Sequence, residues 1–368
     1  MGFPPSTHGD ETLDMSSTAR RAAIVTLVAL SIVLAALILW KIRVVIALFF
    51  LGIIVAAAMR PGVEWLNKRT GLPKGLGVLV HYAAVLGLVA LLLWLVVPSA
   101  SSQIQQAIGR VPTSASDLHQ QTAHSHGLKH QILLGLQKRL KKLPSGTSLV
   151  HPALTVTTRA FEVLVGIFFM FAVAAYWIFE RDKTIGLVQS LVPRNHRRVT
   201  RDTWILIDQK LGAFVRGELI LIVFVALVLS LSFWAIDLPY WLLIGTFAGI
   251  FEIVPVIGPL IAGALAIGVG LTVSWHVALF AGLIVLALRQ IEDYLVVPKV
   301  LGHAVGLSPL VVLVSVIGVG ILLGGFYVLL AIPIAAVLST LVDVVLRDID
   351  PAGEDVPAVM FTGAREET

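Results

Sequence analysis

The sequence predicts an all-α, polytopic membrane protein, and three observations lead to this prediction. Hydrophobic residues make up 57% of the 368 residues and charged residues only 13%, whereas a soluble domain carries roughly 25% charged residues. The mean hydropathy is +0.93, and the apolar residues form runs long enough to cross a bilayer as helices. Pro and Gly interrupt some of these runs. We expect about five full spans, one short span, two interrupted re-entrant helical hairpins and an extramembrane helical hairpin.

Composition and missing motifs exclude several classes of site. The chain has no cysteine, so disulfide bonds, zinc–thiolate sites and thiol catalysis are excluded. The net charge of +5 fits the Lys and Arg that membrane proteins collect in cytoplasmic loops, and no basic patch is interleaved with stacking aromatic residues. The sequence has no Walker-type phosphate loop, no His-Glu-x-x-His pair and no nucleophile elbow. We therefore expect a protein that is not an enzyme, needs no cofactor and binds no nucleic acid.

The N-terminal part of the chain contains a polar tail and the first three spans. Residues 1–19 are rich in Ser, Thr and Pro, and we expect them to be disordered. Spans 1–3 fall within residues 20–97. The first of them is too long for the core of a signal peptide, and no small-residue cleavage site is evident. Pro98 is expected to end the third span.

Residues 98–158 form a polar region that we expect on the extracytoplasmic side. A basic amphipathic helix is predicted at about 131–143, where Ile132, Leu136 and Leu140 share one face. A group of histidines in this region could coordinate a metal, but no carboxylate or cysteine accompanies them in a known ligand pattern. We expect a solvated loop and no metal site. The histidines are His119, His124, His126 and His130.

The remainder of the chain alternates spans with interrupted segments. Residues 159–217 contain span 4 and a basic cytoplasmic segment whose helix is expected in the membrane interface. Residues 218–346 contain span 5 and the hairpins, and residues 347–368 form an acidic C-terminal tail that we expect to be loose. Broken hairpin 1 is predicted at 241–275, the short span at 277–289, and broken hairpin 2 at 308–346 with interruptions at Gly324, Gly325 and Pro333.

The most informative segment is 251–263, which reads FEIVPVIGPLIAG. It places one carboxylate, two prolines and two glycines inside an apolar run. Proline breaks helix geometry, and a charge near the bilayer centre costs on the order of 3 kcal/mol. Broken helices with a buried ionisable group are typical of the path that solute follows through a transporter.

Glu252 in this segment is the first candidate for binding an ion. The break before Pro255 leaves backbone carbonyls without helical partners, and a carboxylate beside such carbonyls suits a cation or a proton. The alternative is structural, with Glu252 paired to Arg289 so that the pair locks the bundle. Gly258 and Pro259 are expected to shape the hairpin tip without contacting solute.

A second polar group lies at the cytoplasmic end of the short span. Gln290 and Asp293 are three residues apart and share a helix face, whereas Glu292 lies off that face. These three side chains are candidate ion ligands, and simple solvation is the alternative for Asp293. Glu218 is a further candidate, although Arg216 stands two residues earlier and suggests an ion pair at the membrane interface.

Basic residues near the ends of the spans predict the orientation of the chain. Lys and Arg gather after the second span and between residues 181 and 216, so the N-terminus is expected in the cytoplasm. Counting the spans onward places the C-terminus in the cytoplasm too. The two broken hairpins then enter from opposite faces, which is the inverted arrangement expected of secondary transporters.

With these residues placed, the sequence resembles the AI-2E family of membrane transporters over about residues 22–343. The resemblance rests on the combination of PGVEWLNKRTGLPKG, VVPSASSQI, FVRGEL, FEIVPVIGPLIAG, RQIEDYLVVPKVLG, GLSPLVVL and AIPIA. It implies movement of a small solute across the cytoplasmic membrane, either an autoinducer-like organic molecule or Na⁺ or Li⁺ in exchange for H⁺. It also implies a homo-oligomeric ring in the lipid bilayer, with a pentamer among the candidate forms.

Two other functions remain as alternatives. A non-transporting oligomeric scaffold for other envelope proteins would need the same spans, and solute flux measured with purified protein separates it from a transporter. An intramembrane enzyme is the second alternative, which the missing catalytic motifs disfavour.

Overall fold

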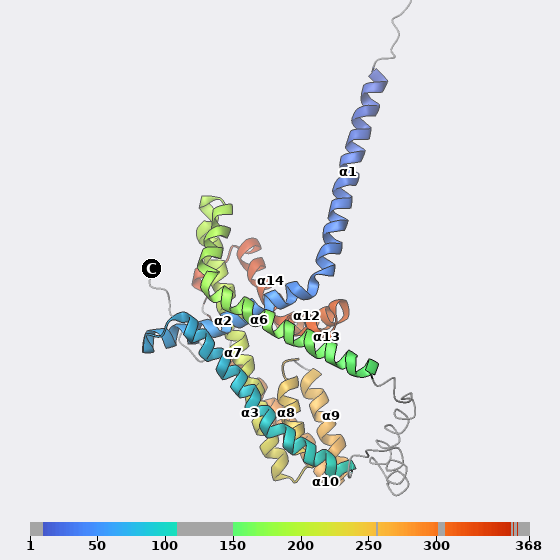
Figure 1. The fold of residues 1–368 in the computed structure, drawn as a ribbon, viewed down its shortest axis with the longest axis vertical. Coiled ribbons are helices and arrows are strands. Elements are labelled where there is room, and N and C mark those ends of the chain that lie inside the picture. Colours follow the sequence, from blue (N-terminus) through green and yellow to red (C-terminus); the bar gives the residue numbers. More distant parts are fainter. Residues whose placement is uncertain are drawn as a thin grey trace, which may run out of the picture. The chain divides into compact units, whose positions relative to one another are not determined.

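The computed structural model describes residues 10–108, 150–254, 257–300, 306–354, 356 and 359 (Figure 1). Regular structure in these residues is helical throughout, and five of the helices are long and apolar enough to cross a membrane. The predicted all-α, polytopic fold is therefore confirmed. The predicted amphipathic helix at 131–143 and the histidine-rich loop lie outside the described residues.

The chain divides into two compact units, Met1–Phe50 and Leu51–Thr368. The first unit contains α1 (Asp10–Lys41) and the start of α2 (Arg43–Thr70). Because α1 begins at Asp10, the prediction of a disordered tail up to residue 19 is wrong. Residues 10–19 contain no Pro or Gly, so nothing in the backbone chemistry stops the helix from beginning before the apolar run.

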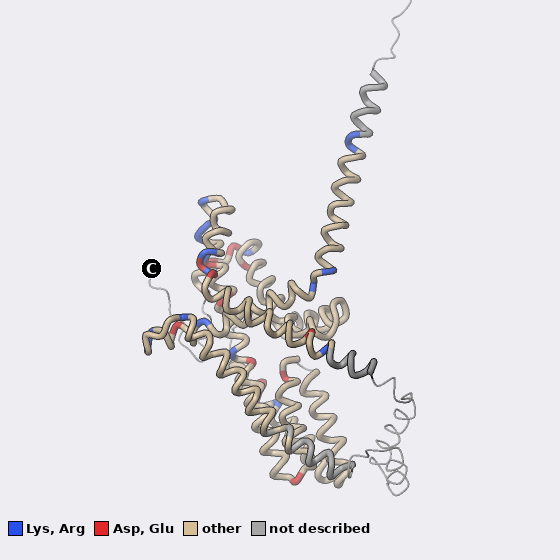
Figure 2. The backbone as a smooth tube through the Cα atoms, in the orientation of Figure 1, with Lys and Arg blue, Asp and Glu red and all other residues tan. Residues whose placement is uncertain are grey.

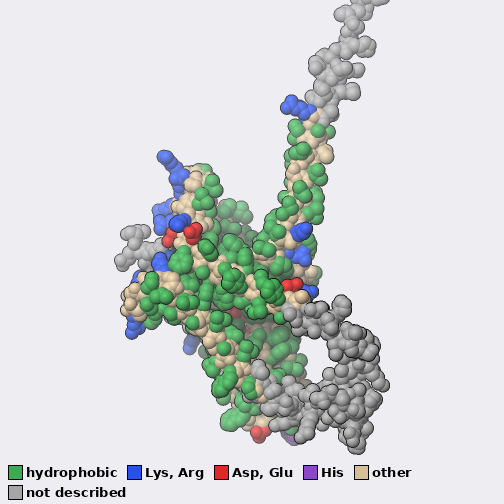
Figure 3. Space-filling view, in the orientation of Figure 1, with side chains coloured by type: hydrophobic (Ala, Val, Ile, Leu, Met, Phe, Trp, Pro, Cys, Tyr) green, Lys and Arg blue, Asp and Glu red, His purple; other side chains and the backbone are tan. Residues whose placement is uncertain are grey.

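The second unit is a bundle of long and short helices. Hydrophobic side chains cover much of the face visible in Figure 3, as expected of a surface that meets lipid. After the remainder of α2, its elements are α3 (Lys74–Ile108), α6 (Val150–Leu191), η1 (Arg194–His196), α7 (Arg197–Ala235), α8 (Trp241–Phe251), α9 (Ile257–Leu271), α10 (Trp275–Ile291), the π-helix η2 (Glu292–Val296), α11 (Val297–Val300), α12 (Pro309–Leu323), α13 (Gly325–Val328), α14 (Ala331–Leu346) and η3 (Pro351–Gly353).

Three predicted boundaries differ from the structure. Helix α3 continues through Pro98 to Ile108, so Pro98 does not end it. The expected interfacial helix and span 5 form one continuous helix, α7, with no break near residue 217. The C-terminal tail is not loose where the structure describes it, because Pro351 and Val359 are buried. For α7 and the C-terminal segment, burial against other elements extends the order beyond what the local sequence predicts.

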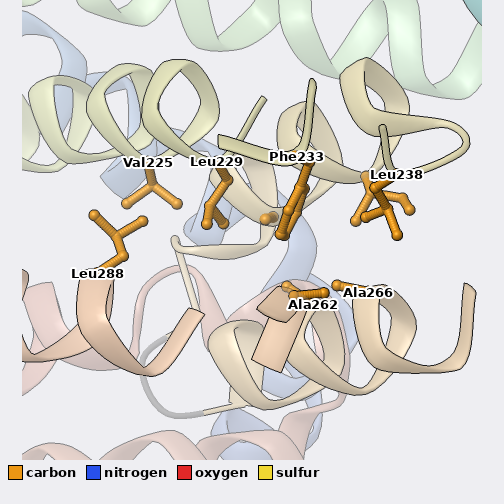
Figure 4. Close-up of a cluster of buried hydrophobic side chains, with 10 residues drawn as sticks. Val225, Leu229, Phe233, Leu238, Ala262, Ala266 and Leu288 are labelled. Atoms are coloured by element: carbon orange, nitrogen blue, oxygen red, sulfur yellow. The ribbon is translucent and has the colours of Figure 1, made fainter. Parts of the chain in front are cut away.

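Helices α7 to α10 form the main core of the second unit. Val225, Leu229 and Phe233 extend from α7 toward the facing helices (Figure 4). They meet Ala262 and Ala266 of α9, where the small alanines leave room for the large side chains of α7. They also meet Leu288 of α10. This packing fixes α7 against the segment that contains the broken hairpin.

The first interrupted hairpin consists of α8 and α9, which stand side by side in Figure 1. They have 11 and 15 residues, and each is shorter than the ~20 residues that a membrane-spanning helix needs. A Cβ atom at Gly258 would collide with the carbonyl oxygen of Phe251. The close return of the chain at this tip therefore requires glycine.

The second interrupted hairpin consists of α12, α13 and α14. Gly324, with φ of +103°, ends α12 in a conformation that residues with a side chain rarely adopt. Pro333 lies inside the first turn of α14 and is not itself an interruption. The two hairpins touch, because Val254 of the first packs against Val316 of α12 and Ala331 of α14.

Glycines let α8 approach α7 closely, and this contact gives a stability prediction. A Cβ atom at Gly249 would lie 2.5 Å from the carbonyl oxygen of Ile222 on α7. Gly249→Ala should therefore force the two helices apart and lower the free energy of unfolding by about 1–3 kcal/mol. Thermal unfolding in detergent measures the effect.

Gly268 in α9 provides a matched control, because a Cβ atom there meets nothing within 4 Å. Gly268→Ala should leave the melting temperature unchanged or raise it slightly, since alanine favours a helix. Equal melting temperatures for the two alanine variants would contradict the close contact between α7 and α8.

Candidate functional site

Three carboxylates contact Arg289 in the second unit, and a fourth, Glu218 on α7, interacts electrostatically with two of them. We call Glu218, Glu252, Glu292 and Asp293 the acidic cluster. Arg289 Nη1 donates hydrogen bonds to Glu252 Oε1 at 3.0 Å and to Glu292 Oε2 at 3.3 Å. Its Nη2 atom lies 3.0 Å from Asp293 Oδ1. One guanidinium therefore joins the tip of the broken hairpin to the first turn of η2.

The members of the acidic cluster differ in their exposure to solvent. The side chain of Glu252 is 6% exposed and that of Glu292 is 4% exposed, whereas that of Asp293 is 44% exposed. Arg289, which contacts all three, is half-buried. The cluster thus extends from the molecular surface at Asp293 to a buried pair of carboxyl groups.

The charges of the acidic cluster are out of balance. Glu218, on α7, interacts electrostatically with both Glu252 and Glu292. Glu252 and Glu292 share Arg289 Nη1 as a hydrogen-bond donor, so these two carboxyl groups lie close together. Among the described residues, Arg289 contacts three of these four carboxylates. Like charges held together in a poorly solvated place repel each other, so the cluster is costly unless positive charge compensates it.

Local backbone geometry explains why the acidic cluster forms here. Helix α8 ends at Phe251, and the amide of Glu252 still donates to the carbonyls of Ala248 and Gly249. Glu252 therefore sits on the last turn, at the place where the chain reverses. On the other side, Glu292 begins a π-helix, a form found mostly as single turns at functional sites.

The structure brings together most of the predicted site residues but not all of them. Gln290 is exposed, and Asp293 turns toward Arg289 rather than acting with Gln290. Gly258 is buried at the hairpin tip, Pro259 is half-buried in the first turn of α9, and Pro255 lies outside the described residues. The structural alternative for Glu252, a pair with Arg289, is present in the structure.

The expected ion pair between Arg216 and Glu218 is wrong. Arg216 Nε donates to the carbonyl of Val359 at 2.9 Å, and its Nη1 atom donates to the carbonyls of Ala57 and Ala58. Residues two positions apart on an α-helix are separated by about 200° around the helix axis. Arg216 and Glu218 therefore point to opposite sides of α7.

Sequence reasoning missed a second buried charged group, where α2, α6 and α7 meet. Arg181 Nε donates to Asp208 Oδ2 at 2.8 Å, and Arg60 Nη1 lies 3.6 Å from the same oxygen. A cavity of about 250 Å³ adjoins this group between Arg181 and Arg201. At helical spacing Asp208 shares a face with the apolar residues Trp204 and Leu211, and a carboxylate on an apolar face is the signal that could have found the group.

Comparison with known proteins agrees with this architecture. The chain is 25% identical over 302 residues to YrrI of Bacillus subtilis, provisionally named a transport protein, covering 81% of this chain and 85% of that protein. It is 26% identical over 293 residues to YueF of the same organism, also provisionally named a transport protein, covering 76% of this chain and 78% of that protein. PerM of Escherichia coli K12, provisionally named a permease, is 24% identical over 210 residues, covering 55% of this chain and 58% of that protein.

A model of one protein family matches the chain over residues 27–347, which include both hairpins and the whole acidic cluster. These residues make up most of the chain, and the relatives named above are transport proteins by their names. Together with the helical membrane fold, this match shows that the chain belongs to the AI-2E family of transporters.

Proposed function

We propose that this chain is a secondary transporter in which the acidic cluster binds the coupling ion, a proton or a monovalent cation. The solute is an autoinducer-like organic molecule, or it is Na⁺ or Li⁺ exchanged for H⁺ by antiport. The observation that carries the proposal is the contact of Arg289 with Glu252 at the tip of a broken hairpin. This contact puts a buried charge at the break between α8 and α9, which supports exchange of that charge when the hairpin moves.

The excess of carboxylates supports competition between Arg289 and an incoming ion. With the guanidinium bound to Glu252 and Glu292, their negative charge is partly neutralised. A proton or cation that enters from the exposed side, beside Asp293, would neutralise the same groups and weaken the hold of Arg289 on the hairpin. The hairpin tip would then be free to shift against α10, which gives alternating access.

The contact between the two hairpins supports a coupled movement. Val254 follows Glu252 by two residues and packs against Val316, Ala331 and Ile332 of the second hairpin. A displacement of the first tip must therefore disturb the second hairpin, because packed interiors do not deform smoothly. This gives one ion-binding event a way to rearrange both hairpins.

We extend the proposal to the setting of the protein. The chain lies in the cytoplasmic membrane with both termini in the cytoplasm, and it assembles into a homo-oligomeric ring. Lys and Arg gather where α6 meets α7 (Figure 2), which supports a cytoplasmic position for that end under the positive-inside rule. Large apolar side chains remain exposed along α3 and α6, so both lipid and a second copy have surface to cover.

A static role for the acidic cluster is the second candidate. The ion pair between Arg289 and Glu252 would then only lock the bundle, as a non-transporting scaffold requires. The two candidate roles predict different solute flux when the charge of Glu252 is removed and the size of its side chain is kept.

Glu252→Gln tests the proposal directly, because it removes the charge and keeps the size of the side chain. We expect assembly to be intact and cation-coupled flux in proteoliposomes to be lost or to lose its dependence on pH. Glu162→Gln is the matched control, since Glu162 is exposed on α6 and pairs only at the surface with Arg159. Flux across a pH series that equals that of the wild-type chain would remove Glu252 from the site.

Arg289→Gln separates the two roles through stability. Removal of the guanidinium leaves Glu252 and Glu292 buried without this partner, which should destabilise the fold by about 3 kcal/mol, the lower end for a broken buried pair. Arg289→Lys keeps the positive charge, so its stability should lie between that of the wild-type chain and that of Arg289→Gln. Thermal unfolding in detergent measures both variants.

In a double variant, Glu252→Gln should recover part of the stability lost with Arg289→Gln, because one uncompensated charge disappears. Full recovery of stability together with unchanged flux would favour the static lock over the transporter.

A further inference from the structure

The described part of the C-terminal segment lies along α7, and we call residues 351–354, 356 and 359 the C-terminal strap. Glu354 Oε1 lies 2.7 Å from Lys210 Nζ. The carbonyl of Val359 accepts a hydrogen bond from Arg216 Nε at 2.9 Å. The side chain of Val359 also packs on Ala213 of α7, which is fully buried. The strap therefore contacts α7 at residues 210, 213 and 216, which share one side of the helix.

The two cations under the strap also bind other helices. Lys210 Nζ donates to Thr340 Oγ1 of α14 at 3.3 Å, and Arg216 Nη1 donates to the carbonyls of Ala57 and Ala58 on α2. Lys210 is only 4% exposed. A buried ammonium held by one hydroxyl and one carboxylate depends strongly on the carboxylate. Through these bonds the strap ties α7 to both α2 and α14.

Helix α7 can transmit this restraint to the acidic cluster. It is one continuous helix from Arg197 to Ala235, and an α-helix turns as a rigid rod over a few residues. Glu218 lies about 3 Å along the axis from Arg216 and about 200° around it. Any rotation of α7 that releases Arg216 from the strap must therefore move Glu218 relative to Glu292.

We infer that Lys210 and Arg216 are positioning residues, through which the C-terminal strap sets the place of Glu218 in the acidic cluster. The strap contacts one side of α7, and Glu218, which interacts with Glu252 and Glu292, lies on the other side. The inference rests on the proposed function for its effect on transport. Its structural part, the restraint of α7, is measured independently of transport.

The structural test uses the absence of native cysteine. Spin labels at Leu219→Cys and Leu295→Cys, both exposed positions that flank the acidic cluster, report the distance between α7 and η2. We expect Glu354→Gln and Arg216→Lys to shift or broaden this distance distribution in the full-length protein. Glu180→Gln is the matched control, because Glu180 forms a similar ion pair with Lys183 in an exposed position. The inference is overturned if Glu354→Gln and Arg216→Lys both give the wild-type distance distribution.

The functional test is the dependence of flux on cation concentration in proteoliposomes. We expect Glu354→Gln to raise the KM for sodium or protons by about 5-fold or more, the lower end of measured couplings between sites, with a smaller change in maximal rate. A purely structural weakening would lower the amount of active protein and leave KM unchanged. Arg216→Lys, which keeps the charge but not the set of hydrogen bonds, should give a larger KM than Glu354→Gln.

The outcomes separate the two proposals. A shifted distance with an unchanged KM would overturn the role of the strap in the acidic cluster. A shifted distance in a protein whose wild-type form moves no cation would support positioning of α7 by the strap and contradict the proposed function instead.

Discussion

The second unit depends on one constraint, which is that charge brought into an apolar bundle must be compensated. Glu252 and Glu292 are buried, and Arg289 contacts both of them from the end of α10. Removal of carboxylates from water is costly unless partners replace the lost solvation. The break between α8 and α9 exists where this compensation is available, because the hairpin tip ends directly against the guanidinium. The same contact ties the end of α8 to α10, and under the proposed function it holds the charge that an ion exchanges.

Helix α7 links this site to the rest of the second unit. One side of the helix packs through Val225, Leu229 and Phe233 against the hairpin and α10. Further toward its N-terminus, Asp208 binds Arg181 of α6, and Lys210 and Arg216 hold α14, α2 and the C-terminal strap. A single helix that contacts α6, α8, α10 and α14 is well suited to coordinate a change at the acidic cluster with the surrounding helices. The small residues of α8 allow the close contact that makes this helix and the hairpin move together.

The sequence predicted the class of fold and the broken hairpins well, because both follow from local chemistry. Apolar run length predicts spans, and FEIVPVIGPLIAG marks a break by the residues themselves. What the sequence could not predict depends on contacts between distant segments. Arg216 was expected to pair with its neighbour Glu218, yet it binds Val359, and the pairing of Asp208 with Arg181 was not predicted at all. Helical spacing tells which side chains share a face but not which helix comes to lie against that face.

The most direct test of the account asks whether the tip of the first hairpin changes the side from which water reaches it. Ile253→Cys introduces a single thiol at an exposed position beside Glu252 in a chain without native cysteine. Its reaction with membrane-impermeant thiol reagents can be followed from each side of oriented vesicles. If the hairpin alternates its access, reversal of the cation or proton gradient should slow the reaction from one side and accelerate it from the other. A thiol that reacts at the rate of free solution from one side only, whatever the gradient, would contradict alternating access through this hairpin.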